Sequence, residues 1–233
     1  MYYDFHMHSC LSPCAENEMT PNNICNMALI KGLDCIAVSD HNSTRQLASL
    51  HEVAKNLPLR LIYGCELQSS EEVHILALFS KLNDTIPFQK WIDSVMPNIP
   101  NDENYFGNQY ILNAQDELIE KEERLLLVSL EATLDECVER IHQFGGKAIL
   151  AHVLDRQNSV TTQLGFIPMD LPYDGLEIKN DEQKLKVLQS HPWIKEDSTL
   201  WLVDSDAHRL IDISEAENFM QNSMIQKLWG DEL

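Results

Sequence analysis

Two histidines separated by one residue, His6 and His8, stand near the start of the sequence, and the segment Asp206-Ala-His208 stands near its end. In an extended strand, side chains two residues apart point to the same face. Each segment therefore offers a pair of groups to one side, and imidazole and carboxylate both bind divalent ions. The spacing predicts a metal site to which both ends of the chain contribute.

Other polar residues lie on or just after short apolar runs. Asp40-His41, Glu66 and His152 come at the ends of such runs, and His74 lies within another. Parallel barrels and open α/β sheets place their sites where the carboxyl ends of strands meet. We therefore expect these side chains to gather at one face of a sheet.

Clustering is what favours metal binding here. A lone histidine on an apolar strand is more often a hydrogen-bonded core or rim residue than a ligand. Six of the nine histidines, however, lie in or beside predicted strand ends together with Glu66 and Asp206. We predict a multinuclear site with roughly two or three divalent ions. Imidazole accepts zinc, manganese and iron alike, so the residues leave the identity of the ions open.

The elements that position these residues alternate between short apolar strands and helices. We predict strands at 2–8, 35–39, 59–63, 73–79, 147–152, 175–179 and 200–204. We predict helices at 21–31, 43–56, 116–124 and 134–144, and a last helix from Ser214. The alternation favours a parallel α/β sheet, open or closed. We expect a single domain over 1–233, with a mostly helical elaboration at about 84–146.

Acidic side chains outnumber basic ones by 37 to 17, which gives a net charge of −20. This charge opposes binding to long nucleic-acid duplexes and to anionic membranes. A phosphate-bearing substrate would have to be attracted locally, by bound ions or a few cations. No apolar run approaches the roughly 18 residues that span a bilayer, and no targeting segment is recognisable. We therefore expect a soluble, cytoplasmic protein, of unknown oligomeric state.

A mixed set of imidazoles and carboxylates indicates a hydrolytic centre. Closely spaced divalent ions lower the pKa of a shared water toward neutrality and stabilise both oxygens of an in-line displacement, which is phosphoester chemistry. The spacing alone leaves open an amidohydrolase that acts on C–N bonds.

These residues, taken in order, resemble a known family. The series consists of His6-x-His8, Ser39-Asp40-His41, Gly64-x-Glu66, His74, Ala151-His152 and Asp206-x-His208. It is similar to the motif series of the PHP (polymerase and histidinol phosphatase) superfamily and covers nearly the whole chain. Each motif is weak alone, whereas the ordered set is specific.

The resemblance implies a distorted seven-stranded (β/α)7 TIM-like barrel that holds up to three ions at its mouth. It implies that His6, His8, Glu66 and Asp206 bind the first ion, that Glu66 bridges to a second held by His74 and His152, and that His41 and His208 hold a third.

Family members commonly supply a histidine or aspartate to the third position from the loop after the first strand. The loop here contains Cys14 and Glu16 instead. The six cysteines lack paired zinc-finger spacing, which predicts reduced, mostly buried thiols. Cys14 is the exception, because it aligns with the missing ligand and thiolate binds zinc or iron well. A structural thiol, or a ligand role for Glu16, are the alternatives.

Four further features have weaker signals. Arg156 could hold a substrate phosphate with its planar guanidinium or form a surface ion pair, and Lys179 offers the same two roles. Asp40 is expected to orient a neighbouring ligand. The segment Phe106–Tyr110 suits a base or sugar contact, although ordinary packing is the simpler interpretation.

Our leading hypothesis is a metal-dependent phosphoesterase that hydrolyses a phosphate ester through a metal-bridging hydroxide. The catalytic group would consist of Glu66, Asp206, His208 and Arg156. The substrate would be a small phosphate monoester, a nucleotide or a short single-stranded oligonucleotide. Two alternatives are a metal-dependent amidohydrolase and a non-catalytic metal-binding or regulatory module.

Overall fold

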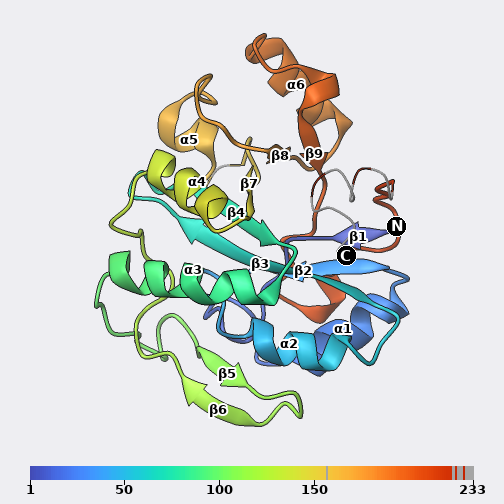
Figure 1. The fold of residues 1–233 in the computed structure, drawn as a ribbon, viewed down its shortest axis with the longest axis vertical. Helices are drawn as coiled ribbons and strands as arrows, with labels where there is room; N and C mark the ends of the chain where they lie inside the picture. Colours follow the sequence, from blue (N-terminus) through green and yellow to red (C-terminus); the bar gives the residue numbers. More distant parts are fainter. Residues whose placement is uncertain (156, 222–223, 225–227, 229–233) are drawn as a thin grey trace.

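The computed structural model describes residues 1–155, 157–221, 224 and 228, and its centre is one curled sheet of seven strands (Figure 1). The spatial order is β1-β2-β3-β4-β7-β8-β9. The strands are β1 Tyr3–Asp4, β2 Cys35–Val38, β3 Arg60–Gln68, β4 His74–Phe79, β7 Lys147–Leu150, β8 Gly175–Glu177 and β9 Leu200–Leu202. All seven predicted strands are therefore present, although the first is much shorter than expected.

The sheet is not parallel throughout. β4 runs antiparallel to both of its neighbours, β3 and β7, whereas the other pairings within the sheet are parallel. A tight turn joins β3 to β4, with Glu72 at a φ of 62°, so no helix separates them. The expectation of a parallel sheet is wrong for these two pairings, while the curled seven-stranded α/β sheet is present. Because of the reversal, His74 at the start of β4 pairs with Gln68 at the end of β3.

The two edges of the curled sheet meet through side chains more than through strand pairing. Met7 and Ala207 form an isolated parallel bridge between them. The buried Asp4 accepts hydrogen bonds from the backbone N–H groups of Ser205 (3.1 Å) and Ser214 (3.0 Å). These contacts bring the His6-x-His8 segment beside the segment that carries Asp206.

Two apolar clusters fill the molecule, one on each face of the sheet. In β4, Leu76 and Leu78 belong to the inner cluster, whereas Ile75, Ala77 and Phe79 belong to the cluster between the sheet and the helices. Both faces of a strand are thus apolar, because successive side chains point to opposite sides. This explains the near-continuous apolar runs in the sequence.

The helices are α1 Pro21–Ile30, α2 Leu47–Ala54, α3 Leu82–Val95, α4 Leu134–Gln143, α5 Val160–Leu164 and α6 Asp181–Ser190, with 3-10 turns at Glu196–Ser198 and Leu210–Asp212. Four of them, α1, α4, α5 and α6, follow a residue whose side chain accepts a hydrogen bond from the first turn. Thr20 accepts a hydrogen bond from the N–H of Asn23 in α1, and Thr133 forms a capping box with Glu136 in α4. Among the described residues, no helix is long and apolar enough to cross a membrane.

The stretch 84–146 differs from the mostly helical elaboration that we predicted. Residues 116–124 form no helix; instead β5 Tyr110–Leu112 and β6 Leu118–Lys121 make a separate antiparallel hairpin, drawn beyond α2 and α3 at the lower end of Figure 1. Glu, Leu and Lys favour helices intrinsically, but tertiary contacts override such preferences. Asp116, at a φ of 60°, lies in the turn between the two strands.

The predicted last helix does not begin at Ser214. Residues 214–221 are not helical, and Phe219 instead forms a bridge with Tyr2. Of the residues that follow, only Met224 and Leu228 are described.

Candidate metal centre

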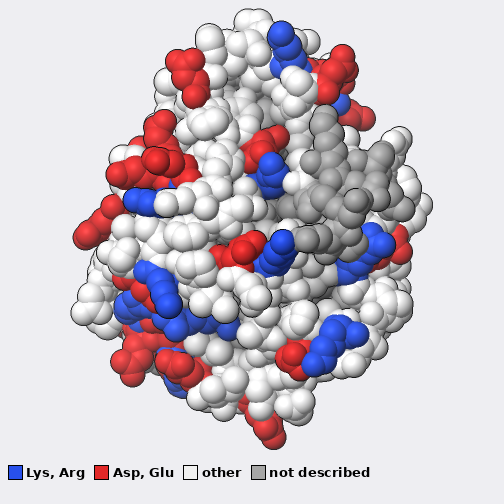
Figure 2. Space-filling view, viewed as in Figure 1, with Lys and Arg blue, Asp and Glu red and all other residues white. Residues whose placement is uncertain are grey.

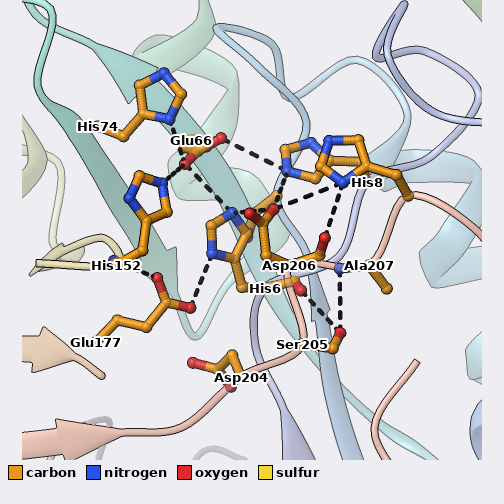
Figure 3. Close-up of polar contacts among 12 residues, drawn as sticks. His6, His8, Glu66, His74, His152, Glu177, Asp204, Ser205, Asp206 and Ala207 are labelled. Carbon is orange, nitrogen blue, oxygen red and sulfur yellow. Dashed lines mark hydrogen bonds and ion pairs between the residues drawn. The ribbon is translucent and has the colours of Figure 1, made fainter. Parts of the chain in front are cut away.

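The carboxylate of Glu66 lies at the centre of the site, almost fully buried (Figure 3). Five imidazoles surround its two oxygens: His74 Nδ1 at 2.8 Å, His41 Nδ1 at 3.0 Å, His6 Nε2 at 3.3 Å, His152 Nε2 at 3.3 Å and His8 Nε2 at 3.5 Å. His74 begins β4, and the other four lie in segments that follow β1, β2 and β7. A carboxylate offers about four lone-pair positions, so five protonated imidazoles cannot all be satisfied by Glu66 alone.

Asp206 approaches the same cluster from the other edge of the sheet. Its Oδ1 lies 3.3 Å from His6 Nε2 and 3.2 Å from His8 Nε2. The ligand atoms of these three residues lie within 4.8 Å of one another, as do those of His41, Glu66 and His74. Two compact donor sets thus adjoin each other, with Glu66 between them (Figure 3).

A third set contains His8, His41 and His208, again with ligand atoms within 4.8 Å. The rings of His41 and His208 both stack on His8. Cys14 lines the same cavity as His208 and His41, and these two histidines lower the pKa of its thiol to about 7 although desolvation opposes ionisation. Its role as the missing ligand stays a prediction. Glu16 reaches this region through its backbone N–H, which donates to the His208 carbonyl at 2.9 Å.

Without metal ions, the neighbouring imidazoles of the site cannot all carry a proton. Burial opposes ionisation of Glu66, but His74, His6 and His41 hold its pKa well below the usual range. Burial and the neighbouring His41 lower the pKa of His8 to about 3, whereas Glu177, Asp206 and Glu66 raise that of His6 against the effect of burial. Neighbouring imidazoles thus cannot all be protonated together. Divalent ions would bind every one of these nitrogens in its neutral form.

The donor atoms fit such ions in one further respect. His6 Nε2 is buried, points at Glu66 and Asp206, and has no hydrogen-bond partner among the described residues. A buried polar atom without a partner is costly. A cation placed between this nitrogen and the two carboxylates would remove that cost.

Glu177, at the end of β8, is a functional residue that sequence reasoning missed. Its Oε1 lies 2.9 Å from His6 Nδ1, and its Oε2 accepts a hydrogen bond from the backbone N–H of His152 at 2.6 Å. A carboxylate on the far nitrogen of a ligating histidine fixes its tautomer and ring orientation. The available signal was an acidic residue inside the apolar run Gly175–Ile178.

Asp40 contacts the imidazole of His8 indirectly, in line with its expected orienting role. It accepts hydrogen bonds from Ser9 Oγ and Ser12 Oγ, both at 2.6 Å. Ser12 Oγ in turn lies 3.2 Å from His8 Nδ1. Asp40 therefore orients His8 through a serine.

Unusual backbone conformations accompany three residues of the site. His152, Asp206 and Asn42, the neighbour of His41, have φ values of 32°, 51° and 46°. Non-glycine residues with positive φ cost about 1–3 kcal/mol and persist where surrounding contacts fix them. The bond from His152 to Glu177 is one such contact. The Asn42 side chain donates to the carbonyls of Leu126 and Val128.

The site opens into a cavity of about 920 Å³. Its described lining includes Cys14, His41, Glu66, Gln68, His74, Leu127, His152, Leu154, Asp155, Gln157, Asn158, Lys179, Asp206 and His208. Lys179 Nζ lies 2.7 Å from Asp155 at the rim. Arg156, the other predicted phosphate contact, lies outside the described residues. Leu127 alone among the described lining residues comes from 84–146, so this stretch contributes little to the wall.

The remaining three histidines lie outside the site. His51 Nδ1 lies 2.7 Å from the Tyr63 hydroxyl, and His142 Nε2 lies 2.8 Å from Asp174. His191 is buried, and its Nε2 accepts the N–H of Ile167.

The chain matches the PHP domain family over residues 4–164. This protein belongs to that family. The resemblance inferred from the motif series is thereby confirmed. No curated protein matches the chain.

Solved structures resemble this PHP domain at low identity. The lesion-specific endonuclease PfuEndoQ from Pyrococcus furiosus has a TM-score of 0.65 and 21% identity over 89% of this chain and 48% of its own. A protein assigned as a metal-dependent phosphoesterase, from Bifidobacterium adolescentis, has a TM-score of 0.61 and 18% identity over 97% and 94%. An amidohydrolase from Chromobacterium violaceum, with bound sulfate and no metal, has a TM-score of 0.64 and 18% identity over 91% and 90%.

These likenesses support the α/β fold with a curled sheet. The PHP domain spans about half the length of the endonuclease. An endonuclease Q was also solved with a 27-mer duplex that carries an abasic lesion at its active site, with a TM-score of 0.63 and 20% identity over 89% of this chain and 49% of its own.

Proposed function

We propose that this PHP domain protein is a metal-dependent phosphoesterase. The observation that carries the proposal is one buried carboxylate, Glu66, with five imidazoles around its two oxygens and Asp206 beside them. A bridging carboxylate between imidazole-rich sets suits closely spaced divalent ions. Such ions, when bound, supply Lewis acidity and an activated water molecule, which is what in-line attack on phosphorus needs.

Three donor sets would hold the ions. Following the assignment that the resemblance implies, the first set is His6, His8, Glu66 and Asp206, the second is Glu66, His74 and His152, and the third is Cys14, His41 and His208. Zinc, manganese and iron all suit donors of this kind. The second and third sets include the fewest carboxylate groups, so their affinity depends most on neutral imidazole and on the Cys14 thiolate.

The substrate would approach from the side of Asp206 and His208. Their side chains are 42% and 31% exposed, whereas those of His6, His8 and Glu66 are buried. Lys179 on the rim is 61% exposed and could exchange its partner Asp155 for a phosphate oxygen. Arg156 remains a proposed phosphate contact.

We infer a substrate that is small or locally single-stranded. A cavity of about 920 Å³ accommodates a phosphate monoester, a nucleotide or the end of an oligonucleotide. Among the described residues on the face in Figure 2, basic side chains lie mostly next to acidic ones. A long duplex needs many phosphate contacts from cations. The likeness to endonuclease Q makes a duplex with an abasic lesion a necessary comparison.

The test is hydrolysis by purified protein that is stripped of metal and resupplied with manganese or zinc. The panel contains an aryl phosphate, histidinol phosphate, a 3′,5′-bisphosphonucleotide, a short single-stranded oligonucleotide and a duplex with an abasic site. Asp206→Asn is the inactive control, and Asp174→Asn, which alters an acid outside the site, is the matched control. Metal-dependent release of phosphate or nucleotide, absent in Asp206→Asn, supports the proposal. Lack of hydrolysis with metal demonstrably bound refutes it.

An amidohydrolase is the second candidate, favoured by the likeness to the Chromobacterium violaceum protein. Barrels of that class characteristically bridge two metals with a lysine, whereas the bridging position here is Glu66. Lys179 is exposed on the rim and paired with Asp155. Cleavage of an amide or lactam panel, with every phosphoester intact, would favour this class. Metal binding without either activity would favour a non-catalytic module.

A further inference from the structure

The insertion between α3 and α4 contacts the loop that carries Cys14. This loop, residues 9–18, is closed by internal hydrogen bonds and joined to His208 through Glu16. The insertion segment, residues 97–125, contains the β5–β6 hairpin and packs behind the loop. Since it supplies none of the described cavity lining, its effect on the site must be indirect.

The closest approach is between Gly107 and the Pro13 carbonyl. Gly107 has a φ of 108°, and a Cβ built on it would lie 2.1 Å from that oxygen and 3.1 Å from the carbonyl carbon. Pro13 directly precedes Cys14. Both the backbone conformation and the close approach require a residue without a side chain. Asn101 fixes the glycine, because its Nδ2 donates to the Gly107 carbonyl at 2.9 Å.

The insertion segment also contacts the loop on either side of the Gly107–Pro13 contact. The N–H of Tyr110 donates to the Cys10 carbonyl at 3.0 Å, and the Cys10 thiol approaches the Tyr110 carbonyl at 3.7 Å. Asn108 Nδ2 donates to Asn17 Oδ1 at 3.2 Å. The insertion thus touches the loop at Cys10, Pro13 and Asn17, so its contacts lie on both sides of Cys14.

Buried carboxamides fix the insertion itself to the body of the protein. Gln46 in the turn before α2 exchanges two hydrogen bonds with the backbone of Leu112. Gln109 donates to the carbonyls of Glu122 and Arg124 and accepts the N–H of Leu126. These hydrogen bonds hold the insertion segment in place, so that it supports the loop rigidly.

We propose that Gly107 is a positioning residue for the third metal position: its missing side chain lets the insertion contact Pro13 and hold Cys14 against His41 and His208. The inference rests on the proposed function, specifically on the third donor set. It assigns to the insertion a role in metal retention, in place of the substrate contact that its aromatic residues suggested.

Cobalt binding tests the proposal without any substrate. Cobalt(II) is added to metal-free protein, and the thiolate-to-cobalt charge-transfer absorption reports a sulfur ligand. The Cys14→Ser variant identifies the sulfur, since the other five cysteines are buried. Wild type that binds cobalt but lacks this absorption would refute the third donor set itself, which is separate from the role of Gly107.

Gly107→Ala is the main variant, and Gly145→Ala is its matched control. Gly145 has a φ of 83°, but a Cβ there would meet only Asp84 Oδ2 at 3.7 Å, so the control carries similar backbone strain away from the loop. We expect Gly107→Ala to lose the absorption or to weaken cobalt binding at this position roughly tenfold or more. Gly145→Ala should retain both. Equal absorption and affinity in Gly107→Ala and wild type would overturn the proposal.

If Gly107→Ala does not fold, Asn101→Ala tests the same positioning role of Gly107. It removes one hydrogen bond to the Gly107 carbonyl and adds no atoms. We expect cobalt to bind the sulfur-containing position roughly two- to tenfold more weakly, the range for one neutral hydrogen bond. Unchanged affinity in folded Asn101→Ala would count against the proposal.

Discussion

Glu177→Gln should weaken metal binding without unfolding the protein. Glu177 accepts from two groups, His6 Nδ1 at 2.9 Å and the His152 N–H at 2.6 Å, and is itself 3% exposed. Glutamine has nearly the same shape but offers one carbonyl oxygen instead of two carboxylate oxygens. One buried donor must therefore face an amide NH₂ group, or the His6 ring must turn.

The expected size follows from that lost acceptor. A buried donor left without a partner costs about 1–3 kcal/mol, and about 1.4 kcal/mol corresponds to a tenfold change in affinity. If most of the cost falls on the bound state, the dissociation constant for the ion at His6 rises roughly 10- to 100-fold. This range matches the usual effect of changing a carboxylate that orients a metal-ligating histidine.

Competition with a chromophoric chelator measures the affinity of metal-free protein for zinc or manganese. Glu182→Gln, in the first turn of α6, is the matched control because Glu182 is exposed and paired only with Lys186 among the contacts that the structure describes. Circular dichroism checks that each variant is folded. A folded Glu177→Gln variant that binds metal within twofold of wild type would refute the assigned role.

Four further outcomes are expected. Asp206→Asn should lower turnover more than about 100-fold, because it removes a proposed ligand and not merely an orienting group; metal content and kcat check it, and full activity would contradict the donor set. Iodoacetamide should modify Cys14 alone in metal-free protein and zinc should protect it, since Cys14 is the exposed one of the six cysteines; peptide mass mapping would reveal any other pattern. Gly64→Ala should destabilise the protein by about 1–3 kcal/mol in urea, because the added Cβ would lie 2.2 Å from Ser39 Oγ and 2.7 Å from the Val38 carbonyl. Gly165→Ala, where the Cβ meets nothing within 4 Å, should cost only the backbone strain that its φ of 81° imposes on alanine. Lys179→Met should raise KM for a phosphate substrate severalfold with little change in kcat, whereas Asp155→Asn should lower KM by freeing the lysine; unchanged KM in both would exclude the rim contact.

The proposed ligands could be recognised from the sequence because each is tied to a local pattern. Apolar runs of strand length are short and distinctive, and a polar residue at the end of one points to the edge of a sheet. His6 and His8 share a face because side chains alternate along an extended chain. The structure brings these residues around Glu66, as the ordered motif series implied.

The direction of each strand and the contacts between distant segments were harder to predict from the sequence. β4 has the apolar composition of its parallel neighbours, and only the tight turn after β3 reverses it. Residues 116–124 have helix-favouring side chains, yet the hairpin forms because β5 is held by Gln46 from another part of the chain. Propensity is a weak local preference, and contacts between distant segments outweigh it.

The amino-acid sequence by itself determined which residues can bind metal and at which strand ends they stand. The first depends on side-chain chemistry, and the second on the alternation of side chains along an extended strand. Only the tertiary structure decided that Glu177 orients His6 and that Gly107 contacts the loop of Cys14. Both depend on the close approach of segments far apart in the chain, such as the 2.9 Å between Glu177 Oε1 and His6 Nδ1, and no local pattern encodes such distances. They are fixed by how the curled sheet and the insertion pack together.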